Sequence, residues 1–292
     1  MSDPLDALRT PVVPVDPDPA FAARLRERLR RALLAPPDRT GGTVTTTGTT
    51  ESRPRLRQGD VGHASLWVPD ADRAAAFYGR VLGWRYRDGG PQRGRQVEGT
   101  NPSHGIWGGA ERPNLMLAYV VDDLDAAIAR VWDAGGRVTG PTRKPRGTVA
   151  DCVDDQGLRF AVYEVSGDVT AAPTGGARPG DLTYVTLGVP DSARARAFYG
   201  VVLGWEFTPG RVEDGWTVKR DGADVHPMVG LWGGAERKAA TAVPMYLVED
   251  IDAAVAAVRA AGGTATEPEK QPYGITAECV DDQGTTFYLG QW

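Results

Sequence analysis

The sequence predicts an α+β protein made of four βαβββ modules, paired into two tandem domains that follow an N-terminal helix. The main observation is a long internal repeat: HASLWVPDADRAAAFYGRVLGW (63–84) parallels YVTLGVPDSARARAFYGVVLGW (184–205), and CVDDQG occurs at 152–157 and 279–284. A weaker repeat lies within each copy, where an apolar run, an acidic residue and a helical pattern follow one another twice. Self-similarity of this kind indicates duplicated structural units.

The repeats set the expected domain boundaries. The first domain is predicted at 59–166 and the second at 181–292, which suits a chain of 292 residues. Residues 167–180, rich in Gly, Pro, Ala and Thr, are predicted to be a linker. Residues 1–58 precede the repeats and are predicted to contain one helix and a further linker.

Each module is expected to run strand, helix and three strands. In the first domain, Asp70 and either Asp122 or Asp123 suit helix N-caps, because a carboxylate accepts the free N–H groups of the first turn. Gly83 and Gly135 suit the left-handed position after each helix. The runs expected to follow as strands are WRYR, RQVEGT and SHGIWG in the first module and RVTG, GTVADCV and RFAVYEV in the second.

The repeated phrase FYG(R/V)VLGW is interpreted as structural. Phe77, Val81 and Leu82 share one helix face and are expected to pack on a sheet. Trp84 is expected to begin the next strand. The phrase therefore predicts fold and not chemistry.

The N-terminal segment carries a separate helical pattern. Asp18 suits an N-cap and Pro19 the first helical position. An apolar stripe flanked by arginines consists of Phe21, Leu25, Leu29 and Leu33. The stripe suits docking on the chain's own domains or on a partner subunit of a homodimer, with a membrane surface as the alternative.

Composition limits the classes of function. A net charge of −5 without a long basic block argues against nucleic-acid binding. No apolar run approaches the length of a membrane span, and the N-terminus lacks the apolar core of a secretory signal, so a cytoplasmic protein is expected. Cys152 and Cys279 occupy equivalent repeat positions and are expected to be inert, buried strand residues.

Taken together, these motifs resemble the vicinal oxygen chelate superfamily, which includes glyoxalase I, bleomycin-resistance proteins, fosfomycin-resistance enzymes and extradiol dioxygenases. The patterns that carry the resemblance are VPD…FY…LGW and VDD(L/I)DAA…AGG…DDQG, or close variants, and they recur in both copies. The resemblance implies that the two modules of each domain form a cupped half-barrel whose concave side holds the ligand. It implies roles in antibiotic resistance or biosynthesis as well as several enzyme chemistries, so it does not fix one function.

The resemblance also implies where a divalent metal would be held, by His and Glu side chains on the concave side. In the first domain His63 fits that pattern. The other matching positions fall at Met116, at Ala161 (or Tyr163 in a shifted register) and near Ile106, and none of these is a hard metal ligand.

An alternative metal set exists only in the first domain, where His63, Glu98 and His104 could provide two imidazoles and one carboxylate. The matching positions in the second domain are Tyr184, Leu231, Val243 and Tyr288, with no His, Asp or Glu. The sequence therefore favours a protein without a metal cofactor, and one divalent metal in the first domain is the alternative.

Aromatic and thioether residues stand where the metal ligands would be expected. Such side chains suit a pocket for a planar organic ligand. The predicted ligand-binding residues are Trp107, Met116, Tyr119, Tyr163, Trp232, Tyr246 and Tyr288. The candidate catalytic residues are His63 acting with Glu98 in the first domain, and Tyr184 in the second, where a tyrosine would act with an acidic residue such as Glu278.

Three functional hypotheses follow. The first is a protein that binds a small planar metabolite in one or two aromatic pockets, either to sequester it or to convert it without a metal. The second is a metal-dependent lyase or dioxygenase that uses the first domain alone. The third assigns one domain a purely structural role. His63 and Tyr184 occupy equivalent positions, so the two domains are expected to treat ligands differently.

Overall fold

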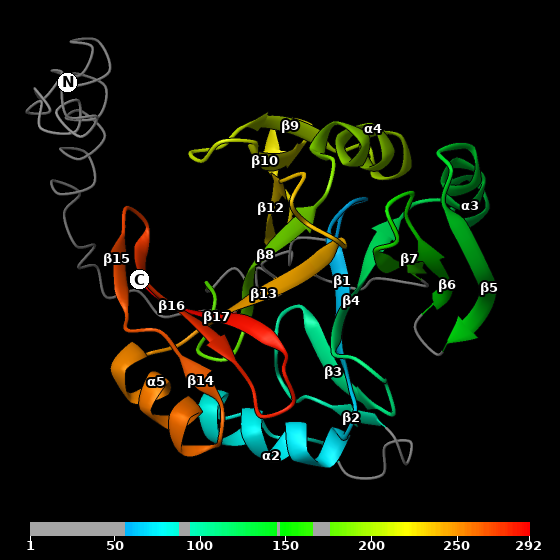
Figure 1. Ribbon diagram of the computed structural model, residues 1–292. Helices are drawn as coiled ribbons and strands as arrows, with labels where there is room; N and C mark the ends of the chain where they lie inside the picture. The colour runs from blue at the N-terminus through cyan, green and yellow to red at the C-terminus, as the bar shows by residue number, and fades with distance from the viewer. Residues whose placement is uncertain (1–55, 88–93, 145–146, 166–175) are drawn as a thin grey trace, which may run out of the picture. The chain divides into compact units, whose positions relative to one another are not determined.

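The computed structural model describes residues 56–87, 94–144, 147–165 and 176–292. The predicted N-terminal helix and most of the predicted linker at 167–180 lie outside these residues. The described residues belong to one compact unit, and Figure 1 shows the arrangement of its elements. Within them, no helix has the length and apolar character needed to cross a membrane.

The first domain repeats the predicted module order. Its elements are β1 (Val61–Val68), α2 (Ala71–Leu82), β2 (Gly94–Gln96), β3 (Ser103–Gly108), β4 (Asn114–Val121), α3 (Leu124–Asp133), β5 (Arg137–Lys144), β6 (Gly147–Val153) and β7 (Arg159–Val165). These strands form one seven-stranded sheet in the order β2-β3-β1-β4-β7-β6-β5. The strand predicted at WRYR is reduced to a single bridge between Tyr86 and Val97.

The second domain follows the same plan with a longer sheet. Its elements are β8 (Leu182–Val189), α4 (Ser192–Leu203), β9 (Glu206–Pro209), β10 (Gly215–Arg220), β11 (Ala223–Asp224), β12 (Met228–Gly233), β13 (Thr241–Leu247), α5 (Ile251–Ala260), β14 (Thr264–Ala265), β15 (Glu269–Gln271), β16 (Gly274–Val280) and β17 (Thr286–Gln291). The strands pair mainly in the order β11-β10-β12-β8-β13-β17-β16-β14. The predicted α+β class and paired modules are confirmed.

The predicted helix ends are present. Asp70 caps α2 by accepting the N–H groups of the first turn, and Gly83 ends it with φ of 68°. Asp123, and not Asp122, caps α3. Gly135 follows α3 with φ of 86°, a conformation that glycine adopts without a steric penalty.

Each sheet has two chemically different faces because side chains alternate along a strand. In β1, Leu66 lies in the buried core whereas its neighbour Ser65 lies on the opposite face. In β8, Leu187 and Thr186 divide in the same way. We call the side that joins the core and the helices the core face, and the other side the outer face.

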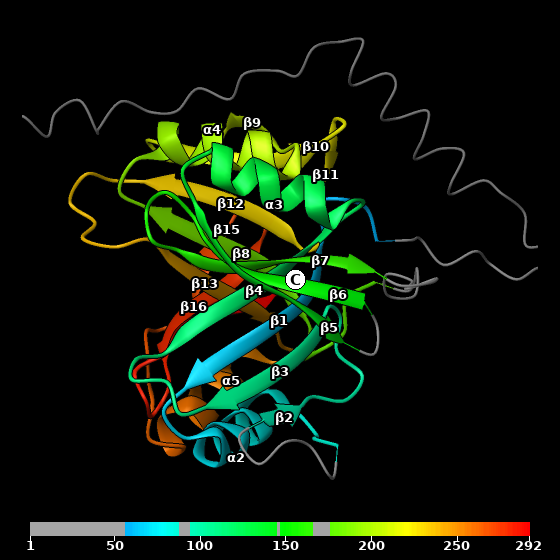
Figure 2. The ribbon, with the colours of Figure 1, turned by 90° about the vertical axis from the view of Figure 1, so that its right-hand side faces the viewer.

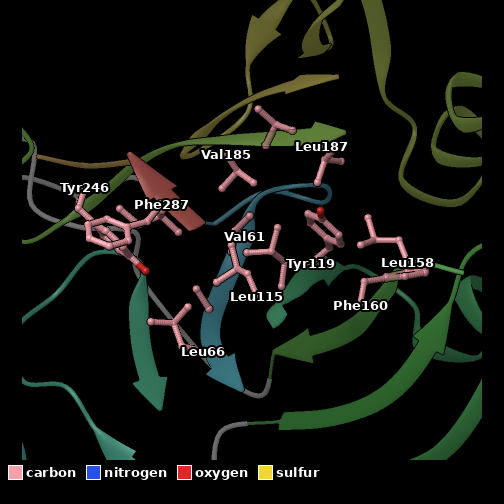
Figure 3. Close-up of a cluster of buried hydrophobic side chains, with 14 of the residues drawn as sticks. Val61, Leu66, Leu115, Tyr119, Leu158, Phe160, Val185, Leu187, Tyr246 and Phe287 are labelled. Atoms are coloured by element: carbon pink, nitrogen blue, oxygen red, sulfur yellow. The ribbon is translucent and has the colours of Figure 1, made fainter. Parts of the chain in front are cut away.

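The two core faces share one hydrophobic core. Figure 3 shows β1, β4 and β7 side chains of the first domain beside β8, β13 and β17 side chains of the second. Helix α2 lies beside α5 of the other domain, and α3 lies beside α4 (Figures 1 and 2). Phe77 of α2 accordingly contacts Phe287 of the second domain, with ring centroids 6.1 Å apart. The helix face predicted to pack on a sheet therefore packs across the domain boundary.

Buried polar contacts join the domains in equivalent pairs. The hydroxyl of Tyr78 in the first FYG phrase donates to the Asp281 carboxylate of the second DDQG phrase at 3.1 Å. The hydroxyl of Tyr199 in the second FYG phrase donates to Asp154 of the first DDQG phrase at 3.0 Å. Each domain thus supplies both halves of an interface with approximate twofold symmetry.

The tryptophans that end the two phrases complete this interface. The Trp84 indole donates to the Gly180 carbonyl at 2.9 Å, and the Trp205 indole donates to the Gly59 carbonyl at 3.1 Å. The prediction that Trp84 begins a strand is wrong, because its ring is inserted between the domains and no ladder pairing includes it. The phrase FYG(R/V)VLGW is repeated because both copies build the same interface.

Candidate functional site

The outer face of the first sheet carries a row of directly paired residues. Across β3, β1, β4, β7 and β6, the row reads Ser103, His63, Ala118, Ala161 and Asp151. Small side chains occupy its centre, with His63 paired to Ala118 on one side and Asp151 paired to Ala161 on the other. The row places one imidazole beside a floor of two alanines.

The matching row of the second sheet has larger side chains. Across β12, β8, β13, β17 and β16, it reads Met228, Tyr184, Met245, Tyr288 and Glu278. Every position of the first row has its counterpart here, and every residue differs. The predicted difference between His63 and Tyr184 therefore extends along the whole row.

His63 is oriented by its neighbours on β2 and β3. Its Nδ1 lies 3.2 Å from Ser103 Oγ, and the Gln96 side chain donates to the same oxygen at 3.2 Å. A Cβ added to Gly105 would lie 3.5 Å from His63 Nε2, an ordinary contact distance, so the ring packs closely over β3. This short polar chain suits a histidine that accepts or donates a proton at the outer face.

Tyr184 occupies the same space in the second domain. A Cβ on Gly230, the counterpart of Gly105, would collide with the Tyr184 hydroxyl. Burial raises the pKa of Tyr184, so its phenol stays protonated at neutral pH. Burial also raises the pKa of Tyr288, whose hydroxyl lies 3.5 Å from Glu278 Oε2. Both phenols are therefore hydrogen-bonding groups at neutral pH.

Exposed tryptophans flank both rows. Trp107 is 37% exposed on β3 and its ring centroid lies 6.5 Å from that of Trp67. Trp232 is 42% exposed on β12 and is covered by the Arg237 guanidinium at 4.5 Å. Each outer face therefore presents one partly exposed indole beside its row, which is a candidate stacking surface for a planar ligand.

Two further predicted ligand-binding residues lie near the first row. Met116 and Tyr163 belong to a small apolar cluster with Ala118 and Ala161, separate from the main core. Trp67 packs against this cluster. The predicted residues Met116, Trp107 and Tyr163 thus gather on one face with His63.

Four further predicted residues do not lie in the outer rows: three are buried in the interior, and Glu98 is exposed. Tyr119 and Tyr246 are only 1% and 0% exposed and belong to the core between the domains, which corrects their assignment to a ligand site. His104 is 1% exposed there, and its Nε2 lies 3.0 Å from the Tyr246 hydroxyl. Glu98 lies exposed just past the end of β2, and its catalytic role with His63 stays a prediction.

The predicted alternative metal set is not assembled. His63 is on the outer face and His104 on the core face, so the two imidazoles are separated by the sheet itself. The outer row beside His63 presents alanine where a further ligand would be needed, and the second row presents methionine beside Tyr184. Across the described ranges, no three His, Cys, Asp or Glu side chains are grouped to hold a metal ion. The residues present do not fit the metal site that the superfamily implies.

The structure adds residues that sequence reasoning missed. Arg237 lies over Gly188 and Trp232, whereas Trp67 stands at the position equivalent to Gly188. Trp292 lies over Gly290 beside Met245 on the outer face of β17. The two repeats differ visibly in sequence at Trp67 and Gly188. The sequence does not show that the Arg237 side chain lies over Gly188, where the first domain has the Trp67 ring.

The described domains thus define a tandem protein of paired βαβββ modules with one candidate ligand face on each sheet. The family model described as "Glyoxalase-like domain" matches residues 63–163 and 184–289 of this chain. The chain belongs to this glyoxalase-like domain family, as its resemblance to the vicinal oxygen chelate superfamily predicted.

Two relatives are informative. The chain is 27% identical over 258 residues to the "Putative glyoxylase CFP32" of Mycobacterium tuberculosis, covering 80% of this chain and 95% of that protein. It is 32% identical over 132 residues to the "Anthracycline biosynthesis protein DauV" of Streptomyces sp. (strain C5), covering 40% of this chain. The latter match spans 46% of the relative, or about half its length.

Solved structures share the fold. A Mn(II)-bound glyoxalase from Novosphingobium aromaticivorans superposes with a TM-score of 0.61 at 17% identity, over 81% of this chain and 82% of that one. The 2,3-dioxygenase LapB from Pseudomonas sp. KL28 gives 0.60 at 17% identity, over 81% and 94%. At such identities the likeness concerns the fold alone.

Proposed function

We propose that the protein binds a small, planar organic metabolite on the outer faces of its two sheets, without the superfamily's metal. The observation that carries this proposal is the pair of outer-face rows. They replace a metal-ligand set with alanine, methionine and tyrosine, and exposed Trp107 and Trp232 lie on the same faces. Flat aromatic surfaces with few polar anchors favour flat ligands.

The two domains have different roles in this proposal. The first domain combines small floor residues with His63, which suits a ligand that lies flat on the sheet and exchanges a proton with the imidazole. The second domain presents neutral phenols, which suits binding by stacking and hydrogen bonding. The printed names of the relatives, a putative glyoxylase and an anthracycline biosynthesis protein, agree with sequestration or metal-independent conversion of a metabolite.

Binding of a neutral planar probe tests the proposal. Anthraquinone-2-carboxamide is expected to quench tryptophan fluorescence with a saturable, micromolar Kd. Trp232→Ala and Trp107→Ala should each weaken binding to their own domain roughly three- to tenfold, because stacking contributes about 0.5–1.5 kcal/mol. Trp132→Ala is the matched control, since this tryptophan is 53% exposed on α3, away from both outer faces.

The purified protein also allows a test of whether binding requires a metal ion. Dialysis against EDTA is expected to leave the Kd for the probe unchanged, and elemental analysis is expected to find no stoichiometric Fe, Zn, Ni or Mn. A stoichiometric metal that disappears in His63→Ala would support instead a metal-dependent enzyme acting through the first domain. Absence of saturable probe binding would also overturn the proposal.

A further inference from the structure

Arg237 of the second domain stacks on a tryptophan and has a buried nitrogen without a partner, as Arg196 over Trp216 also does. It follows β12 in the phrase GLWGGAER, and its guanidinium carbon lies 4.5 Å from the centre of the Trp232 ring. Its Nε is buried and has no hydrogen-bond partner. Within the described part of the chain, no carboxylate forms an ion pair with this side chain. A desolvated guanidinium nitrogen without an acceptor is costly unless a ligand or water supplies one.

A glycine creates the space that Arg237 occupies. Gly188 lies on the outer face of β8, between the core residues Leu187 and Val189. A Cβ at Gly188 would lie 2.8 Å from Arg237 Nη1 and 3.0 Å from Thr241 Oγ1. The guanidinium is therefore held across β8, over the sheet, and not extended into solvent.

The first domain places its cation differently, although it repeats the phrase GGAER. There Arg159 of β7, and not the arginine of GGAER, lies over a tryptophan, with its guanidinium carbon 5.8 Å from the centre of the Trp67 ring. The counterpart of Gly188 is Trp67, which fills this position and contacts Trp107. The counterpart of Arg237 is Arg112, which is exposed. The same phrase thus places its arginine differently in the two domains, because the neighbouring strand has Trp67 in the first domain and Gly188 in the second.

The charges near Arg237 favour an oriented ligand. Burial raises the pKa of Tyr288 most, Glu278 raises it further and Arg237 lowers it. Glu278 is the β16 end of the outer row, whereas Arg237 lies off the row, over Gly188 on β8, so the outer face presents an anion and a cation at separate places. A ligand with an anionic group at one end and a neutral or hydrogen-bond-donating group at the other matches this polarity.

We propose that Arg237 binds the carboxylate, or an equivalent planar oxyanion, of a flat aromatic ligand at the outer face of the second domain. The inference rests on the proposed function and adds the chemical class of the ligand. The planar guanidinium fork can donate two parallel hydrogen bonds to a carboxylate while its face stacks on Trp232.

Paired probes that differ only in charge test this inference. Anthraquinone-2-carboxylate is expected to bind the wild-type protein at least tenfold more tightly than anthraquinone-2-carboxamide, as measured by calorimetry at fixed ionic strength. Arg237→Gln should weaken the carboxylate roughly tenfold or more, because hydrogen bonds to charged groups contribute about 1.5–3 kcal/mol. The carboxamide affinity should change by less than about twofold, because it gains no charge-assisted bond.

The variant Gly188→Ala tests whether the position of the Arg237 guanidinium matters, because it leaves the charge of Arg237 unchanged. It keeps the arginine but places a methyl group 2.8 Å from Nη1, so the guanidinium must shift from its position over β8 and the carboxylate preference should fall. The control is Arg112→Gln, which removes the equivalent charge from the first domain and should leave both affinities unchanged. Circular dichroism of each variant checks that the fold is retained.

The outcomes separate this inference from the proposed function. If the carboxamide binds but the carboxylate binds no more tightly, or if Arg237→Gln and Arg112→Gln lower carboxylate affinity equally, the role of Arg237 is refuted and planar-ligand binding stands. If neither probe binds saturably, planar-ligand binding itself fails, and this inference fails with it.

Discussion

Replacing Asp281 by alanine is expected to lower the free energy of unfolding of the whole two-domain unit by about 3–5 kcal/mol. The carboxylate is buried, and it accepts the Tyr78 hydroxyl at 3.1 Å and the backbone N–H groups of Gln283 and Thr285, each at 2.8 Å. The substitution leaves the buried Tyr78 hydroxyl and Thr285 N–H, and the partly buried Gln283 N–H, without this acceptor. Because the core is continuous across the domains, the loss should affect both of them.

Urea denaturation followed by tryptophan fluorescence and far-UV circular dichroism measures this effect. Both probes should report one coincident transition, shifted to lower urea concentration in Asp281→Ala. Arg73→Gln is the control, because its ion pair with Asp282 is exposed and its loss should cost less than about 1 kcal/mol. Two separate transitions, or a loss no larger than that of the control, would show that the domains are energetically independent.

Acid is expected to destabilise the protein through His104. Burial, with a smaller contribution from the charge of His63, lowers the pKa of His104 to about 3. Its Nδ1 faces the Gly105 carbonyl at 3.1 Å, so Nδ1 carries the proton and Nε2 accepts the Tyr246 hydroxyl at 3.0 Å. The neutral imidazole thus satisfies both neighbours, and protonation would place a second N–H against the Tyr246 oxygen and a charge in the core.

The free energy of unfolding should decrease as the pH falls, because the pKa of His104 is lower in the folded state than in the unfolded state. The contribution of neutral His104 is fully present above the unfolded pKa near 6.5, and it is lost progressively as pH falls toward 3. The slope should approach about 1.4 kcal/mol per pH unit, for a total of order 4 kcal/mol. Urea midpoints at pH 7, 5.5 and 4.5 measure the slope. Buried Asp154 has a raised pKa and acts in the opposite direction, so the comparison must be made between variants.

The double variant His104→Val, Tyr246→Phe is the matched comparison for this slope. Valine is the residue that the second domain uses at the equivalent position, Val229, and phenylalanine removes the hydroxyl that would lose its acceptor. The double variant should be less sensitive to pH between 6.5 and 4.5 than the wild type. An unchanged slope would mean that His104 is not the group responsible.

The two domains combine a symmetric interior with asymmetric outer faces. Tyr78, Tyr199, Asp154 and Asp281 hold the same contacts twice, so neither copy can change without cost to the other. The outer rows carry no such reciprocal contacts, and all five positions have diverged. The outer faces can therefore differ between the domains while the shared core stays intact.

The placement of some site residues on a face of the sheet could be predicted from the sequence, and that of others could not. His63, Trp107 and Trp232 lie on the outer faces, and their predicted catalytic and ligand-binding roles stay predictions. Tyr119 was misplaced because β4 is buried on both faces and its sequence NLMLAYVV has no alternation to read. The register between β1 and β4 also shifts between Val61 and His63, so strict alternation does not predict which face each residue here occupies.

The sequence alone determined the module order, the duplication, the helix caps and the family, because these depend on local patterns and on the similarity of one segment to another. Only the tertiary structure decided that FYG(R/V)VLGW meets DDQG across the domains, that His63 and His104 lie on opposite sides of one sheet, and that Arg237 lies over Gly188. These facts depend on strand register and on contacts between residues far apart in the chain. A one-residue change of register exchanges the two faces of a strand, and no local pattern in a strand buried on both sides records which register is adopted.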